Sequence, residues 1–422
     1  MESNLLPSSR REAETALEQR ARRLRGRLAP MVVCLSHSWG GLEQVAVNDA
    51  VDVGALGIGV RFLCLEGSPV HASLAGKEGI TAIPLDYRPR DYFDLKLRAD
   101  LRRLIADGVN LIHTHQTSLL GSLSPWLWAY PRVGLIASRH IMNNHDKRNF
   151  FHRFIYKRLD ALVVMSRTLK QNMLSTHPLS DRQIKVVNLG LDFSRFDPKR
   201  VDPARQRAAW GADDETVVIG LVGRIDPAKG QATFIKAAAG LMKDWGASRK
   251  IRFVIVGEET LGRASQHLDE LKRLVAQFHL EDVVVFAGYQ ENIPEVMSAF
   301  DLFVMPSRQE AFGLVAIEAM AMECPIVISR GGSADEIVGE QEFGILVRPE
   351  DAFDLQRRIR LLIEDATTRE AMGARAREHV LKNYDRLGRR IQTLELYERT
   401  LRRRRWVDAP ASGTSEQASD PI

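Results

Sequence analysis

Short apolar runs alternate with longer amphipathic stretches along most of the chain. Seven such runs follow one another from Met31 onward: MVVCLS, IGVRFLCLE, ITAIPL, VNLIHTH, VGLIAS, ALVVMS and IKVVNL. A polar or helical segment follows each run. Apolar strands that alternate with helical segments are typical of βαβ units in a parallel sheet. The first part of the chain therefore predicts an α/β domain.

The alternation pauses between Asp192 and Glu215, where two Asp-Pro steps and many charged residues predict an interdomain crossing. Six more runs follow: VVIGLVG, IRFVIVG, VVVFAG, LFVMPS, IVIS and GILVRP. Between and after them, amphipathic patterns predict helices over residues 230–243, 264–277, 292–300, 314–322 and 352–364. We expect an α/β protein of two Rossmann-like, doubly wound domains in tandem.

These patterns divide the chain into six expected parts. They are a basic flexible segment (1–28), a first Rossmann-like domain (29–195), a linker (196–215), a second Rossmann-like domain (216–385), a basic helix (386–406) and a disordered tail (407–422). The first segment offers few apolar anchors, so we expect at most a loosely attached helix there. The tail is polar and rich in Pro and Ser, a composition that does not form a packed core.

Composition narrows the class of protein further. The 422 residues are 45% apolar and 27% charged, as in globular proteins, and the three cysteines show no metal-ligand spacing. No apolar run approaches the roughly 18 to 20 residues that span a bilayer, and the first residues resemble no secretory signal. We therefore expect a cytoplasmic protein that has no nucleic-acid partner.

Positive charge is concentrated at the two ends of the chain. Seven arginines lie between Arg10 and Arg27, and eight between Arg386 and Arg405. A further stretch, 147–158, combines Phe150, Phe151 and Phe154 with lysines and arginines. Such basic and aromatic segments fit a peripheral contact with the inner face of the cytoplasmic membrane. Ordinary solvated helix faces, or phenylalanines packed on the sheet, explain the same pattern and stay open as alternatives.

The two nucleotide-binding motifs that are common in α/β proteins are absent. No strand is followed by GxGxxG, and Gly57-Ile-Gly59 precedes a strand instead of following one. The segment from Gly223 to Gly230 has its lysine before the second glycine, so it is not a P-loop. These absences argue against an NAD-dependent oxidoreductase and against a P-loop nucleotidase.

The segment from Pro306 to Ala321 is the strongest candidate for chemistry. A strand end, a glycine turn at Gly313 and a helix start follow one another there. The free N–H groups of a helix start bind anions such as a diphosphate. Glu310 precedes the helix and Glu318 lies inside it, so the two carboxylates can accept hydrogen bonds from different hydroxyls of one ligand. Taken alone, the pair could equally be a helix cap and a solvated residue.

The E-x7-E spacing, with Phe312, Gly313 and Leu314 between the two glutamates, resembles the donor site of the retaining GT-B glycosyltransferases of family 4. The resemblance implies that Glu310 binds hydroxyls of the transferred sugar and that Glu318 binds the nucleotide ribose. It also implies that the backbone of Phe312, Gly313 and Leu314 meets the diphosphate or the sugar.

The segment from Gly220 to Gly230 resembles the GR-x4-KG element of the same family, with Arg224 and Lys229 as its charged residues. Cations at the carboxyl end of a strand can neutralise a leaving diphosphate. In other surroundings an Arg and a Lys near a turn are more often surface charges. The resemblance further implies that neither a metal ion nor another cofactor is needed, since the nucleoside diphosphate sugar is a substrate.

Three matches extend the resemblance into the first domain. Gly40, Gly41 and Glu43 resemble the GGxE loop, whose glycine amides approach the donor phosphate or the acceptor, although a plain tight turn is the alternative. His140 resembles the active-site histidine that contacts the transferred sugar. His115 is a candidate for the acceptor side, together with Glu43.

His113 and His115 alternate along one predicted strand. We expect their side chains to leave the strand on opposite faces, and therefore not to bind one metal ion together.

The family resemblance implies a GT-B enzyme whose two domains face a central cleft, with the last basic helix returning to the first domain. It would transfer a hexose-type sugar from a UDP- or GDP-sugar to a saccharide or glycolipid hydroxyl, with retention of configuration. The expected pathway is the assembly of lipopolysaccharide or of another cell-surface glycan. A GT-B sugar-nucleotide epimerase and a catalytically silent sugar-nucleotide-binding protein are the alternatives.

Overall fold

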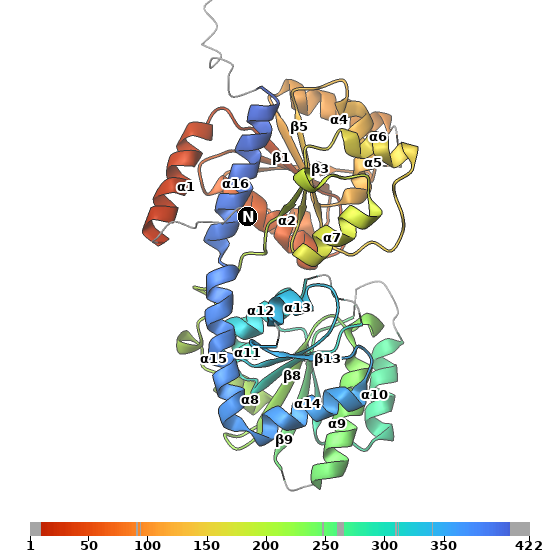
Figure 1. Ribbon diagram of the computed structural model, residues 1–422, viewed down its shortest axis with the longest axis vertical. Coiled ribbons are helices and arrows are strands. Elements are labelled where there is room, and N and C mark those ends of the chain that lie inside the picture. Colours follow the sequence, from red (N-terminus) through yellow and green to blue (C-terminus); the bar gives the residue numbers. More distant parts are fainter. Residues whose placement is uncertain are drawn as a thin grey trace, which may run out of the picture. The chain divides into compact units, whose positions relative to one another are not determined.

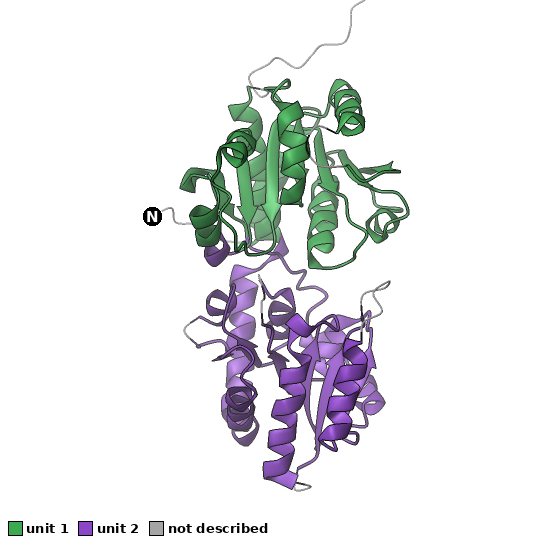
Figure 2. Cartoon of the chain, turned by 90° about the vertical axis from the view of Figure 1, so that its right-hand side faces the viewer, with its two compact units in different colours: residues 1–165, 170–187, 387–422 green, residues 166–169, 188–386 purple. Residues whose placement is uncertain are grey.

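The computed structural model describes residues 10–405, apart from 90, 91, 93, 247, 248, 260–265, 309, 311 and 340. The described chain forms two compact units (Figure 2). Unit 1 holds the residues up to Met165, residues 170–187 and the residues from Leu387 onward. Unit 2 holds residues 166–169 and 188–386. The predicted tail, 407–422, and the predicted start of a helix at Ala264 lie outside the described residues.

Unit 1 is built on a seven-stranded parallel sheet with the order β3-β2-β1-β4-β5-β6-β7 (Figure 1). The strands are β1 (Pro30–Cys34), β2 (Val60–Leu65), β3 (Ile80–Leu85), β4 (Leu111–Thr114), β5 (Gly134–Arg139), β6 (Ala161–Val164) and β7 (Ile184–Val186). Strands β1, β4 and β6 are buried along their whole length, as parallel strands covered on both faces require.

The helices of the first part of the chain follow the predicted alternation. They are α1 (Arg10–Leu24), α2 (Gly41–Gly54), α3 (Pro69–Ser73), α4 (Leu95–Ala106), α5 (Leu120–Leu127), α6 (Phe150–Lys157) and α7 (Arg167–Thr176), with α16 (Arg386–Arg403) added from the end of the chain. Single 3-10 turns lie at Thr117–Leu119 and Asp181–Gln183. Asp94 and Asn149 accept hydrogen bonds from backbone N–H groups three residues on, which fixes the starts of α4 and α6.

Unit 2 is built on a six-stranded parallel sheet with the order β10-β9-β8-β11-β12-β13. Its strands are β8 (Val217–Val222), β9 (Ile251–Val256), β10 (Val284–Gly288), β11 (Leu302–Met305), β12 (Ile326–Ser329) and β13 (Ile345–Val347). Its helices are α8 (Ala204–Ala209), α9 (Gln231–Trp245), α10 (His267–Gln277), α11 (Ile293–Ser298), α12 (Leu314–Ala321), α13 (Ala334–Val338), α14 (Ala352–Glu364) and α15 (Ala366–Asn383), with 3-10 turns at Pro198–Arg200 and Pro227–Lys229. This is the strand order of a doubly wound domain, so the predicted α/β fold is confirmed.

The prediction of a flexible segment over residues 1–28 is wrong from Arg10 onward. Helix α1 packs into the core of unit 1 through Ala13, Leu17, Ala21 and Leu24, which share one helix face. Arg20 forms ion pairs with Glu395 and Glu398 of α16, which lies beside α1 (Figure 1). The sequence gives only a weak signal for this packing, because two of the four buried residues are alanines and arginines surround them.

The predicted linker, 196–215, is also part of a folded unit. It contains α8, and Trp210, at the end of that helix, is buried and stacks on Phe300. Unit 2 begins at Asn188 in this region, seven residues before the predicted end of the first domain at 195. The charged, Asp-Pro-rich composition that suggested a linker belongs instead to structured turns, in which Asp197 and Asp202 accept hydrogen bonds from backbone N–H groups.

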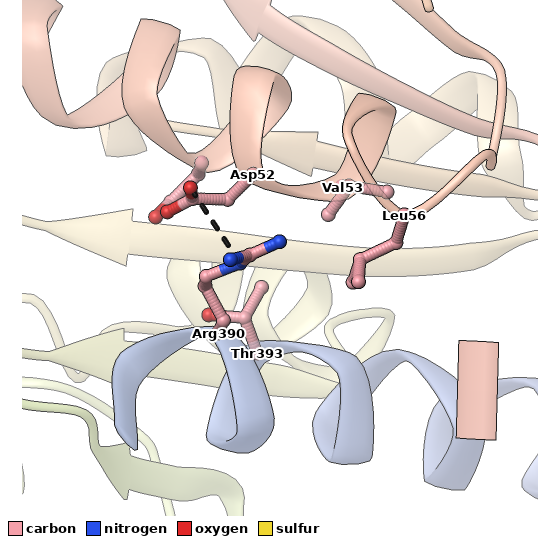
Figure 3. Close-up of a pocket in the computed structure, with 6 residues that line it drawn as sticks. Asp52, Val53, Leu56, Arg390 and Thr393 are labelled. Carbon is pink, nitrogen blue, oxygen red and sulfur yellow. Dashed lines mark ion pairs between the residues drawn. The ribbon is translucent and has the colours of Figure 1, made fainter. Parts of the chain in front are cut away.

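Helix α16 is held on unit 1 by buried charge. Arg389 donates to both carboxylate oxygens of Asp49 in α2 at 2.7 Å. One turn further along α2, Asp52 lies 3.7 Å from Arg390, which points toward it (Figure 3). Because Asp49 and Arg389 are both almost fully buried, this pair fixes how the last helix sits on the first sheet.

Candidate active site

The residues predicted for the donor side follow β8 and β11 at their carboxyl ends, and these are the two central strands of the sheet in unit 2. The strand order reverses between these two strands, and ligands of open α/β sheets bind at such a point. Arg224 and Lys229 follow β8, and Glu310 follows β11. Nζ of Lys229 lies 2.6 Å from Oε2 of Glu310, so the structure brings together two residues that are 81 positions apart.

Two glycines shape the loops around this pair. Gly230 has φ +77°, and a Cβ atom there would lie 2.1 Å from the carbonyl oxygen of Pro306. Gly313 has φ +82° and precedes the first turn of α12, where a Cβ atom would lie 2.9 Å from Cε of Met305. Only glycine allows these close approaches without strain. The approach of Gly230 to Pro306 sets the loop after β8 against the loop after β11, and that of Gly313 to Met305 packs the start of α12 on the end of β11.

The remaining donor-side residues differ in exposure. Arg224 is half exposed, with Asp226 3.7 Å away, so its guanidinium is accessible to a ligand. Phe312 is buried, and its ring packs against that of Tyr384. Leu314 is half-buried in the first turn of α12. Arg224 therefore offers an accessible charge, while Phe312 and Leu314 flank Gly313 within four residues of Glu310.

Glu318 is half-buried in α12, about one turn inside the helix. Burial raises the pKa of its carboxyl to about 7, although the charge of Arg195 acts in the opposite direction. A partly buried carboxylate forms stronger hydrogen bonds with hydroxyls than one in open water, as ribose binding would need. Along the chain, Glu310 precedes Gly313 by three residues and Glu318 follows it by five.

In unit 1 the predicted residues lie at the corresponding reversal of strand order, between β1 and β4. Gly40 and Gly41 form the start of α2, directly after the loop that follows β1. Glu43 is buried in the first turn of α2, and its Oε2 lies near Gly40, 3.4 Å from where a Cβ atom would be. Its carboxylate therefore packs against the glycine loop of its own unit.

The prediction that His113 and His115 lie on opposite faces is wrong. Residues two apart on a strand share a face, and the two rings lie 4.4 Å apart, centroid to centroid. The His115 ring also stacks on that of His140 at 5.5 Å, so three imidazoles form one row. Both nitrogens of His113 are hydrogen-bonded at 2.8 Å, to Tyr397 and to Ser138.

The row of imidazoles is uncharged near neutral pH. Burial is the main cause: it lowers the pKa of His113 to about 4 and that of His140 to about 3, and it lowers the pKa of His115 well below its usual range. The charge of Arg389 acts in the same direction on all three. The ring nitrogens of His115, and Nε2 of His140, are buried and have no hydrogen-bond partner among the described residues. Nε2 of His140 is therefore an unpaired polar atom within the described part of unit 1.

Among the described residues, one group of side chains has the spacing of metal ligands: atoms of Asp49, His113 and His115 lie within 4.8 Å of one another. The other bonds of these residues argue against an ion there. Asp49 already accepts from Arg389 with both oxygens, both nitrogens of His113 are occupied, and the buried guanidinium would repel a cation. Sequence reasoning missed Asp49, Arg389 and Tyr397 because their partners are far away in the chain.

The comparisons with known proteins agree with this geometry. Residues 202–379 match the family described as Glycosyl transferases group 1, and residues 39–195 match Glycosyltransferase Family 4. The D-inositol 3-phosphate glycosyltransferase of Corynebacterium jeikeium is 30% identical over 371 residues, which are 81% of this chain and 88% of that protein.

The chain belongs to the group 1 glycosyltransferases of family 4. The lipopolysaccharide core biosynthesis mannosyltransferase LpsB of Rhizobium meliloti is 30% identical over 55% of the chain. The match spans 63% of the length of LpsB, and also 63% of the inositol 3-phosphate glycosyltransferase of Corynebacterium kroppenstedtii.

Solved structures show the GT-B fold. A glycosyltransferase from Rickettsia africae superposes with a TM-score of 0.79 at 20% identity, over 89% of this chain and 99% of that one. HepE of Anabaena, solved in complex with UDP-glucose, gives a TM-score of 0.74 at 21% identity, over 89% of this chain and all of that one. Family membership and fold therefore agree with the two doubly wound units.

Proposed function

We propose that this chain is a retaining glycosyltransferase that moves a hexose-type sugar from a UDP- or GDP-sugar to an acceptor hydroxyl. The Lys229–Glu310 pair supports this most directly. It combines a cation suited to a diphosphate with a carboxylate suited to sugar hydroxyls, at the reversal of strand order in the unit that matches the group 1 family.

Charge development in the reaction explains the donor-side residues. When the bond between the anomeric carbon and the phosphate breaks, negative charge grows on the diphosphate and positive charge on the sugar ring. Arg224, Lys229 and the backbone N–H groups at the start of α12 stabilise the diphosphate. Glu310 leaves Lys229 and accepts hydrogen bonds from the sugar, while Glu318 accepts them from the ribose. No divalent ion is needed to neutralise the diphosphate.

Retention of configuration follows from the family resemblance. The departing phosphate takes the proton of the acceptor hydroxyl, which attacks from the same face that the phosphate leaves. His140 contacts the transferred sugar as a neutral imidazole, because burial keeps its pKa near 3. A neutral ring with a free buried nitrogen exchanges hydrogen bonds with a hydroxyl and adds no positive charge beside the developing cation.

The proposed acceptor is a saccharide or glycolipid of a cell-surface glycan such as lipopolysaccharide. The relative LpsB, whose name places it in lipopolysaccharide core biosynthesis, supports this class. Gly40, Gly41, Glu43 and His115 are the residues of unit 1 that we assign to the phosphate or acceptor side.

The test is nucleotide release from a panel of UDP-, GDP- and ADP-sugars, with and without membrane glycolipid extract. We expect release from one donor that increases with extract, survives a metal chelator and falls at least about 100-fold in Glu310→Ala and Arg224→Ala. Glu281→Ala and Arg273→Ala, which remove an exposed Glu and an exposed Arg of unit 2, are the matched controls and should retain full activity. The anomeric configuration of the product, read by NMR, tests retention.

Two results would overturn the proposal. Conversion of the donor to an isomeric sugar nucleotide without any acceptor would favour an epimerase. Donor binding without release, in folded protein and with every donor, would favour a silent binding protein.

A further inference from the structure

A cationic cavity opens on the surface of unit 1 at the C-terminal end of α16. Its volume is about 210 Å³, and it is lined by Trp128, Pro131, Lys157, Arg158, Arg403 and Arg404. Four of these six residues are cations, and none is acidic. A concave site lined by charge of one sign attracts ligands of the opposite sign.

Two of the four cations are fixed as part of the wall. Arg404 donates to both carboxylate oxygens of Asp160, at 2.9 and 3.0 Å, and Arg158 donates to the backbone carbonyls of Leu127 and Val133. Nη1 of the buried Arg158 is 3.7 Å from Asp160 and has no hydrogen-bond partner among the described residues. One carboxylate thus serves two guanidinium groups, so the wall keeps a net positive charge.

The other two cations, Lys157 and Arg403, are exposed at the ends of α6 and α16. Neither has an ion-pair partner within the part of the chain that the structure describes. Exposed cations without carboxylate partners keep their whole charge for a ligand.

An aromatic surface continues from this cavity. Phe150, Phe154 and Lys157 lie at positions i, i+4 and i+7 of α6 and therefore share one face. Phe150 is 87% exposed and Phe154 40% exposed. Trp128, which lines the cavity, stacks on Phe154 with ring centroids 5.6 Å apart. The cations and the exposed rings thus form one continuous surface.

We propose that this surface docks on an anionic membrane, with a lipid phosphate in the cavity and the rings of Phe150, Phe154 and Trp128 in the interfacial layer. Aromatic side chains favour the membrane–water interface, and basic residues are attracted to anionic headgroups. A soluble anion would use the cavity but would leave the exposed rings without a partner, and this favours a lipid surface. No helix of the described residues is long and apolar enough to cross a bilayer, so the contact is peripheral.

The test is cosedimentation of the full chain with vesicles of phosphatidylcholine alone or mixed with phosphatidylglycerol. Each basic residue near an anionic surface contributes about 1 kcal/mol, or about fivefold in affinity. The double variant Lys157→Gln/Arg403→Gln should therefore bind mixed vesicles about 25-fold more weakly. Phe150→Ser should also weaken binding. The assay measures no sugar transfer, so its result does not depend on the proposed function.

Matched controls come from unit 2. Lys236→Gln/Lys272→Gln removes two exposed lysines, and Phe353→Ser removes a phenylalanine that is 66% exposed. These variants should bind vesicles like the unaltered chain, and thermal melts should show that all variants are folded. Equal binding to both kinds of vesicle, equal losses in the control variants, or binding of inorganic phosphate without vesicle binding would each overturn the proposal.

Discussion

Nζ of Lys229 lies 2.6 Å from Oε2 of Glu310, at the carboxyl ends of neighbouring strands. Without a ligand, the residue that we assign to the diphosphate thus neutralises the residue that we assign to the sugar. Each partner is about a quarter exposed, so neither is enclosed by the pairing. A donor that supplies a diphosphate to one and hydroxyls to the other replaces the pair with two new sets of hydrogen bonds.

Replacing Lys229 and replacing Glu310 should affect the binding of the product nucleotide differently. Lys229→Met should weaken UDP or GDP binding by about 10- to 100-fold, because a charge-assisted hydrogen bond to the diphosphate is lost. Glu310→Gln should leave that affinity within about threefold, since the product nucleotide lacks the sugar, while sugar transfer collapses. Calorimetric titration with UDP and GDP measures the affinities. Equal weakening in both variants would contradict the assignment, and Lys229→Arg should restore part of the affinity.

Glu318 should make stability depend on pH in the neutral range. Its folded pKa of about 7 lies above the usual value near 4.5, so the folded state holds a proton that the unfolded state has lost. Stability should therefore fall as pH rises from about 5 to 8, by at most about 3 kcal/mol for this group. Urea unfolding of the unaltered chain and of Glu318→Gln at both pH values measures it. The same change in free energy of unfolding between pH 5 and pH 8 in both proteins would contradict the prediction.

The buried imidazoles should destabilise the chain at acidic pH. Their folded pKa values are lower than the usual 6.5, so the unfolded state binds protons that the folded state excludes. Stability should be complete above about pH 6.5 and should decrease as pH falls toward 4, by up to about 2 kcal/mol per histidine at pH 5.

His115→Phe keeps a flat ring in the row but takes up no proton. The difference in free energy of unfolding between pH 7 and pH 5, from urea denaturation, should therefore be smaller in this variant than in the unaltered chain. His37→Phe, which changes an exposed histidine of the same unit, is the control and should keep the full difference. A larger acid sensitivity in His115→Phe would show that the ring is charged in the folded state.

Gly230 should tolerate no side chain. An alanine there needs a positive φ and also displaces the carbonyl of Pro306, which together cost about 2 to 5 kcal/mol. Gly288 also has positive φ, but nothing lies within 4 Å of its Cβ position, so Gly288→Ala should cost only about 1 to 2 kcal/mol. Urea denaturation measures both. Gly230→Ala should in addition weaken UDP or GDP binding, because Lys229 is its neighbour. Equal losses of stability in Gly230→Ala and Gly288→Ala would contradict the close approach of Gly230 to Pro306.

The fold class follows from the sequence alone, whereas the donor-side residues named from its motifs stay predictions. Strand and helix periods are local properties, so the thirteen strands and the helices α9, α11, α12, α14 and α16 could be predicted within a few residues. Arg224, Lys229, Glu310 and Glu318 could be named as candidates because the spacing within each motif is short. The predictions of a flexible segment at residues 10–28 and of a linker at residues 196–215 are wrong. These alanine-rich or charged segments are stabilised by contacts with residues that are distant in the chain.

Only the tertiary structure decided which of these residues meet. The Lys229–Glu310 bond joins two loops through strands that are adjacent in the sheet but separated by two other strands in the chain. The Asp49–Arg389 pair and the row of His113, His115 and His140 likewise depend on the packing of α2, β4, β5 and α16. The physical reason is that periodicity specifies which face of an element is buried, whereas burial of charge and the pKa of a side chain depend on atoms brought together from distant positions.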